Sequence, residues 1–109
     1  METELELKGE AFVKALWDDE EQVYYSESNI PGLFIEATSL GDFEEILFDV
    51  APELIIENII KPQLRAQGIE CEVVEDGSKR GNVPYSDIPK SFPFVWQGAA
   101  PRQVNLAVA

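Results

Sequence analysis

The 109-residue chain contains no histidine, which removes the side chain most often used for acid–base catalysis and metal ligation near neutral pH. Its one cysteine, Cys71, cannot form a disulfide within the chain, and this usage is typical of a reducing compartment. Glu70 and Glu72 flank Cys71, and their negative charges disfavour a thiolate. A buried structural cysteine is therefore favoured over a nucleophile, and catalysis is disfavoured.

Long apolar runs are also missing. No run approaches the roughly 18 apolar residues that a membrane span requires, so we expect none. The first eight residues are acidic and alternate in polarity, without the basic start and apolar core of a secretory signal. We therefore expect a cytoplasmic protein.

Basic residues are scarce in the first part of the chain. Residues 1–60 carry 16 acidic and 2 basic side chains, whereas residues 61–109 carry 5 acidic and 6 basic ones. Such a surface repels phosphate backbones and anionic membranes, because these are bound through lysine and arginine. It is either a solvated acidic surface or one that attracts a basic protein partner.

Alternating polarity predicts a hairpin with strands at 11–17 and 22–26, joined by an acidic turn at 18–21. Pro31 and Gly32 suit the centre of a type II turn, and a third strand is expected at 33–37. Further strands are expected at 69–75 and 104–108. We expect Trp17, Tyr25 and Phe43 in the core.

Between the third and fourth strands the pattern predicts one amphipathic helix. Thr38 or Ser39 can cap its start. Pro52 is expected to kink or break it, and Pro62 and Gly68 to close the helical region. The expected apolar stripe consists of Leu40, Phe43, Leu47, Val50 and Leu54.

The remaining candidates for a site are acidic and aromatic residues. The acidic turn at 18–21 could bind a divalent cation but lacks the spacing of an EF-hand loop, so we expect no metal and no cofactor. The helix acids at 44, 45, 49, 53 and 57 form a polar face or a partner-facing ridge. Three aromatic residues of the C-terminal part cannot all be buried locally and could dock on another chain. The candidate partner-binding residues are Asp18, Asp19, Glu20, Glu21, Tyr24, Phe34, Phe92, Phe94 and Trp96.

Three short motifs occur in a fixed order: Trp17-Asp18, Ile30-Pro31-Gly32-Leu33 and Pro52-Glu53-Leu54. With the strands around them, they resemble the HicB-like antitoxin superfamily, and within it a small branch with a Trp-Asp turn and an Ile-Pro-Gly-Leu loop. The resemblance covers residues 9–75. It implies an α+β, partial ribonuclease-H-like fold of order β-β-β-α-β. Three antiparallel strands would pack on one long, proline-kinked helix, without the catalytic carboxylates of that enzyme.

The resemblance also implies a function. Members typically dimerise and neutralise a small basic HicA-like toxin that cleaves mRNA. We therefore expect a non-catalytic antitoxin or regulatory module, homodimeric, that binds a basic protein and neither nucleic acid nor membrane. Residues 1–75 would form the HicB-like domain and residues 76–109 a proline- and aromatic-containing extension, which lacks the operator-binding module of full-length antitoxins.

Two other functions stay open from the sequence. The chain could be a stand-alone homo-oligomeric binding or assembly module without a toxin. It could also be a metallo-nuclease that uses Asp18 and Asp19, although these acids cluster in one turn rather than converge from separate strands.

Overall fold

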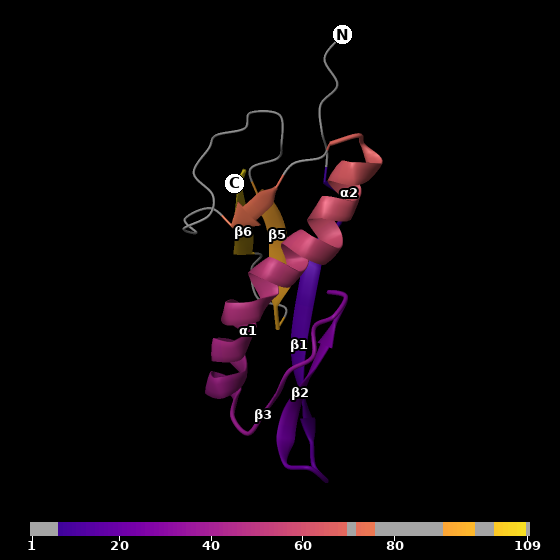
Figure 1. The fold of residues 1–109 in the computed structure, drawn as a ribbon. Coiled ribbons are helices and arrows are strands. Elements are labelled where there is room, and N and C mark those ends of the chain that lie inside the picture. The colour runs from indigo at the N-terminus through magenta and orange to yellow at the C-terminus, as the bar shows by residue number, and fades with distance from the viewer. Residues whose placement is uncertain (1–6, 70–71, 76–90, 98–101, 109) are drawn as a thin grey trace.

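The computed structural model describes residues 7–69, 72–75, 91–97 and 102–108 (Figure 1). They form an α+β structure in which a helical run packs on one face of a six-stranded sheet of order β3-β2-β1-β5-β6-β4. β1 and β5 are parallel, and the other neighbouring strands are antiparallel. The elements are β1 Ala11–Asp18, β2 Val23–Ser28, β3 Glu36–Ala37, α1 Leu40–Ile55, the π-helix η1 Ile56–Ile60, α2 Lys61–Ala66, β4 Val73–Glu75, β5 Ser91–Trp96 and β6 Arg102–Val108.

The hairpin of β1 and β2 confirms the alternation in the sequence. Val13 and Trp17 lie on the same face of β1, and Val13 is fully buried. Tyr24 lies directly opposite Trp17 and therefore shares this face. Tyr24 therefore packs against the core, and the half-buried Tyr25 faces the other side, the reverse of the expectation. Trp17 is not a core residue either: it is 45% exposed, because the hairpin extends beyond the start of α1 (Figure 1).

The loop between β2 and β3 contains the expected tight turn. Gly32 has a φ of +85°, and the N–H of Leu33 donates to the carbonyl of Ile30 at 3.2 Å. This bond draws Leu33 into the turn, so the third strand, expected at 33–37, is confined to Glu36–Ala37. The side-chain amide of Asn58 donates to the carbonyl of Pro31 at 2.8 Å and ties the loop to the helical run.

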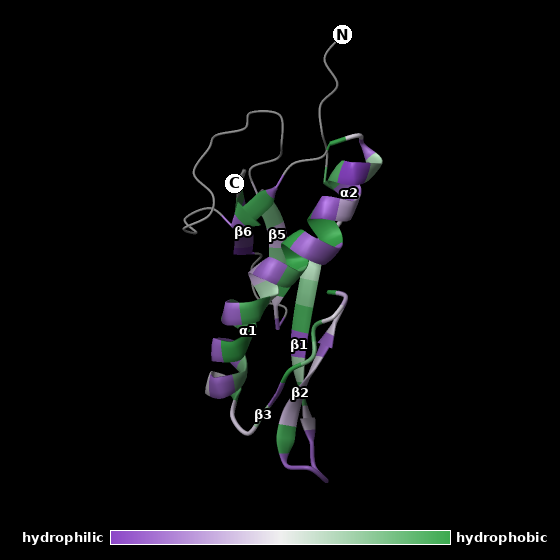
Figure 2. Ribbon diagram, in the orientation of Figure 1, coloured by the Kyte–Doolittle hydropathy of each residue, from purple (hydrophilic) through white to green (hydrophobic). Residues whose placement is uncertain are grey.

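Ser39 caps α1, because its hydroxyl oxygen accepts the N–H of Asp42 at 3.1 Å. The expected apolar stripe is partly wrong. Leu40 is 43% exposed, and Val50 and Leu54 are only partly buried. The helix lies on the sheet along an i, i+4 row, and Figure 2 shows its apolar side turned toward the strands. The buried row of α1 is Phe43, Leu47, Ala51 and Ile55.

Pro52 lies inside α1 and does not interrupt the helical run, which continues through η1 and α2. Figure 1 shows a bend between α1 and α2, in agreement with the predicted kink. Pro62 does not close the run but stands in the first turn of α2, where its missing N–H is tolerated. Gly68, with a φ of +85°, follows α2 and donates its N–H to the carbonyl of Arg65.

The C-terminal strands complete the core. Phe92, Phe94 and Trp96 are only 1%, 4% and 7% exposed, so the expectation that they cannot all be buried within the chain is wrong. β5 pairs with β1 and places alternate side chains beneath α1. There, the ring of Trp96 stacks on that of Phe43 at 5.3 Å, and Phe94 meets Phe48 edge-on at 6.3 Å.

The last strand, expected at 104–108, is confirmed as β6, which begins two residues earlier. Of the fourth strand expected at 69–75, the described residues show only β4, and Cys71 lies outside them. The core therefore includes strands from both sides of residue 75. Within the described ranges, no helix is long and apolar enough to cross a membrane.

Candidate partner-binding surface

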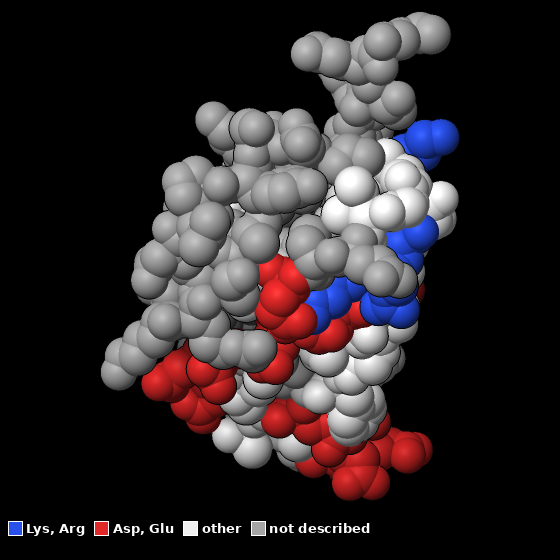
Figure 3. Space-filling view, turned by 45° about the horizontal axis from the view of Figure 1, so that its top comes forward, with Lys and Arg blue, Asp and Glu red and all other residues white. Residues whose placement is uncertain are grey.

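The solvent side of α1 carries a row of carboxylates opposite its buried row. Asp42, Glu45, Asp49 and Glu53 are all exposed, as expected for positions near the same side of a helix. On the face shown in Figure 3, carboxylates form several patches, and the lysine and arginine side chains lie along one side, partly against carboxylates. The solvent side of α1 is therefore acidic.

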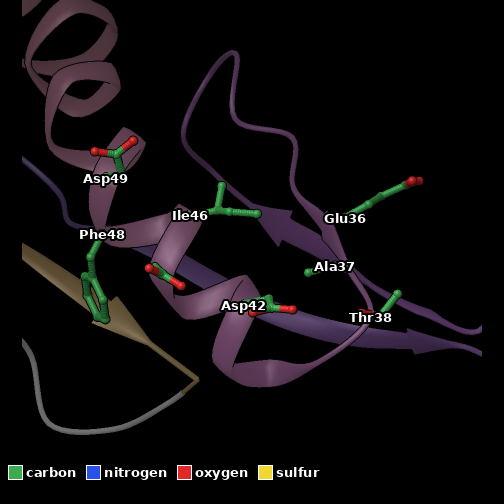
Figure 4. Close-up of a pocket in the computed structure, with 8 residues that line it drawn as sticks. Glu36, Ala37, Thr38, Asp42, Ile46, Phe48 and Asp49 are labelled. Atoms are coloured by element: carbon green, nitrogen blue, oxygen red, sulfur yellow. The ribbon is translucent and has the colours of Figure 1, made fainter.

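A cleft of about 850 Å³ lies between α1 and β3. Four of its eight lining residues are acidic: Glu36, Asp42, Glu45 and Asp49. Figure 4 shows Ile46 directed from α1 toward the strands, and this side chain is 40% exposed. No lysine or arginine of the described residues lines the cleft. Its chemistry suits a basic side chain whose aliphatic part can cover Ile46.

The tip of the hairpin is a second acidic element. The carboxylate of Asp18 accepts the N–H groups of Glu20 and Glu21 at 2.9 and 3.2 Å, so Asp18 shapes the turn. Asp19, Glu20 and Glu21 point into solvent, and behind them the rings of Trp17 and Tyr24 meet at 4.8 Å. Among the described residues, no group of three or more Asp, Glu, Cys or His side chains could hold a metal ion.

The expected partner-binding residues fall into three places. Asp18, Asp19, Glu20, Glu21 and Tyr24 lie together on the hairpin. Phe34 stands apart in the loop before β3 and is 71% exposed. The three aromatic residues of β5 lie in the core and offer no exposed surface for docking.

Sequence reasoning missed the residues that complete the cleft, Glu36, Asp42 and Ile46. Ile46 lies outside the buried row of α1 and next to Glu45. An apolar side chain among helix acids was the signal that could have found it.

The ammonium of Lys61 forms ion pairs with Glu57 at 2.7 Å and with Glu72 at 3.1 Å. Burial acts to lower the pKa of Lys61. The hydrogen bonds to Glu57 and Glu72 and their negative charges outweigh it, so the pKa is raised above its ordinary value. This ammonium therefore stays charged and holds η1 against the segment that enters β4.

A family model described as a domain of unknown function, DUF1902, matches residues 10–83, which is more than half of the chain. The chain belongs to the DUF1902 family. No curated protein and no solved structure matches it. The DUF1902 match begins just before β1 and extends past β4, so it includes the hairpin, the cleft beside α1 and the whole helical run. β5 and β6 follow the matched segment, although they complete the core of the DUF1902 domain.

Proposed function

We propose that this DUF1902 protein is a non-catalytic, HicB-like antitoxin or regulatory module that binds and neutralises a small basic protein, a HicA-like toxin that cleaves mRNA. The observation that carries the proposal is the cleft beside α1, which four carboxylates line together with the exposed Ile46. No lysine or arginine of the described residues lines this cleft. The strand–strand–strand–helix order and the three sequence motifs support the HicB-like assignment. The proposed setting is the cytoplasm, where such a toxin meets mRNA.

The energetics of such a surface favour recognition more than tight binding. Each exposed carboxylate–cation pair contributes about 0.2–1 kcal/mol, so four give roughly 1–4 kcal/mol. The exposed side chains of Ile46 in the cleft and of Trp17 on the hairpin can add apolar contacts with the partner. The excess negative charge raises the association rate with a basic protein, and salt above about 0.15 M screens that effect.

The test uses a small basic protein encoded next to this chain. We expect the two to co-purify, and their affinity to fall steeply as salt is raised. The double variant Glu36→Gln/Glu45→Gln removes two cleft carboxylates and should weaken binding by about 5- to 10-fold. Glu10→Gln/Glu27→Gln changes the net charge equally outside the cleft and is the matched control. Equal effects of the two variants, or an affinity independent of salt, would remove the cleft from the proposal.

Removal of the C-terminal part of the chain is not a useful test of docking. A truncation of residues 83–109 removes β5 and β6, whose side chains fill the core. Such a chain would lose stability and could not report on docking. Point substitutions on exposed residues are the informative variants.

An alternative is a stand-alone homo-oligomeric module, and one observation favours it. The sheet face turned away from α1 carries half-buried apolar side chains from three strands. The strand pairing places Phe12, Leu16, Tyr25 and Val95 on that face. A second copy could cover this face, as the expected homodimer requires. A dimer in sedimentation that Tyr25→Glu dissociates, with no binding to a basic neighbour protein, would favour this alternative.

A further inference from the structure

A second groove, of about 380 Å³, lies on the flank of the helical run that faces β4. Its helical wall is an apolar row of Phe48, Pro52 and Ile56, spaced at i, i+4 and i+8. Its other wall is β4, which contributes Val73 and Val74. A helix flank faces a β-strand across this groove.

β4 is the last strand in the order of the sheet and pairs with β6 on one side. Among the described residues, no strand pairs with its other edge. Within the described residues, the backbone groups on that edge have no strand partner, and edges of this kind recruit extended peptides. A peptide added there would lie against the apolar row of the helix.

An acidic row runs beside the apolar one. Asp49, Glu53 and Glu57 each follow a member of the apolar row by one residue, and Glu75 stands at the end of β4. Lys61 already pairs with Glu57. Within the described residues, no ion pair engages Asp49, Glu53 or Glu75. The groove therefore offers three carboxylates to cations from outside.

The spacing of these rows matches that of an extended chain. Positions i and i+4 of a helix are about 6 Å apart along its axis. Alternate residues of a strand are about 6.6–6.8 Å apart and point to the same side. A strand lying beside the helix can thus present successive alternate side chains to successive helix turns.

We propose that the groove between the helical run and β4 binds an extended basic segment of the protein partner, added to the sheet as a strand next to β4. Every second residue of the segment faces the helical run. Among these residues, small apolar side chains contact Phe48 and Pro52, and lysine or arginine side chains reach Asp49, Glu53 and Glu75. The inference rests on the proposed function only for the origin of the segment. The cleft beside α1 binds the folded surface of the partner, and the groove binds its extended segment.

The test measures fluorescence anisotropy of a labelled synthetic peptide, acetyl-(Lys-Ser-Val-Ser)₂-amide, with the full-length chain. The lysine and valine residues of this peptide share one face when it is extended. We expect saturable binding, weakened about fivefold by Glu53→Gln/Glu75→Gln through the loss of two ion pairs. Glu10→Gln/Glu27→Gln, which lies outside both the cleft and the groove, changes the net charge equally and is the matched control. It should change the peptide affinity by less than about twofold, because distant exposed charges are screened. A peptide N-methylated at alternate residues on its pairing edge should not bind, because it cannot donate to β4.

Absence of saturable binding, an equal loss in both double variants, or unchanged binding of the N-methylated peptide would each overturn the groove as a strand-addition site. The proposed function fails on different evidence. If the intact basic partner does not bind at all, the function is refuted, whereas peptide binding alone decides the groove.

Discussion

Replacing Phe92 by alanine tests whether β5 belongs to the hydrophobic core. Phe92 is 1% exposed, and its strand lies between β1 and β6 in the middle of the sheet. Truncation of a buried phenylalanine costs about 3–5 kcal/mol, because the lost contacts add to the cost of a cavity. A domain of this size has a total stability of about 5–15 kcal/mol, so the variant should be close to unfolding. Phe34→Ala is the matched control, since Phe34 is 71% exposed, and should change stability by less than about 0.5 kcal/mol.

Urea unfolding followed by circular dichroism measures both variants. With a slope of about 1–3 kcal/mol per M, Phe92→Ala should lower the midpoint by roughly 2 M, whereas Phe34→Ala should leave it nearly unchanged. Similar small shifts for the two variants would refute the burial of β5. If Phe92→Ala instead abolished an oligomer without loss of stability, Phe92 would be a docking residue, as the sequence suggested. Sedimentation of each variant distinguishes these results.

Three further substitutions test local features, each by urea unfolding. Ser39→Ala removes the cap of α1 and should cost about 1 kcal/mol, whereas Thr38→Ala, one residue earlier, should cost far less. Lys61→Met removes both ion pairs and should cost about 1 kcal/mol at neutral pH. Because the folded-state pKa of Lys61 is raised, its contribution is complete below the ordinary value of 10.5 and is lost as pH rises through the raised pKa; the stability deficit of Lys61→Met should shrink over that range. Gly32→Ala should cost about 1–2 kcal/mol, because alanine is strained at a φ of +85°.

Local patterns predicted most of the first half of the fold. Alternation and turn chemistry act between near neighbours, so the hairpin, the turn at Gly32 and the cap at Ser39 could be read from the sequence. The pairing of β2 with β1, which places Tyr24 opposite Trp17, decides which of Tyr24 and Tyr25 faces the core, and the sequence does not fix this register. Because side chains alternate along a strand, a shift of one residue exchanges the two faces.

Long-range pairing explains what the sequence could not show. β5 joins β1 through the pairing of Phe94 with Ala11, which lie at opposite ends of the chain. A run of aromatic residues on a single strand has the same local pattern whether it enters the core or an interface. The composition of residues 76–109 suggested an extension of the domain. The burial of one face of β5 depends instead on the pairing of β5 with β1. That pairing is known only from the arrangement of the sheet.

The packing of α1 on the sheet determines where the acidic side chains of α1 are exposed. One row of α1 is buried in the core, and the solvent row of carboxylates on its other side has the cleft on one flank and the groove on the other. Asp49 and Phe48 line both depressions, which makes this turn of α1 the common wall of the cleft and the groove. A basic partner held in the cleft would therefore stand next to the edge of β4 that has no strand partner among the described residues. Binding of its folded surface would raise the local concentration of any extended segment that it carries, so two weak contacts could act as one stronger one.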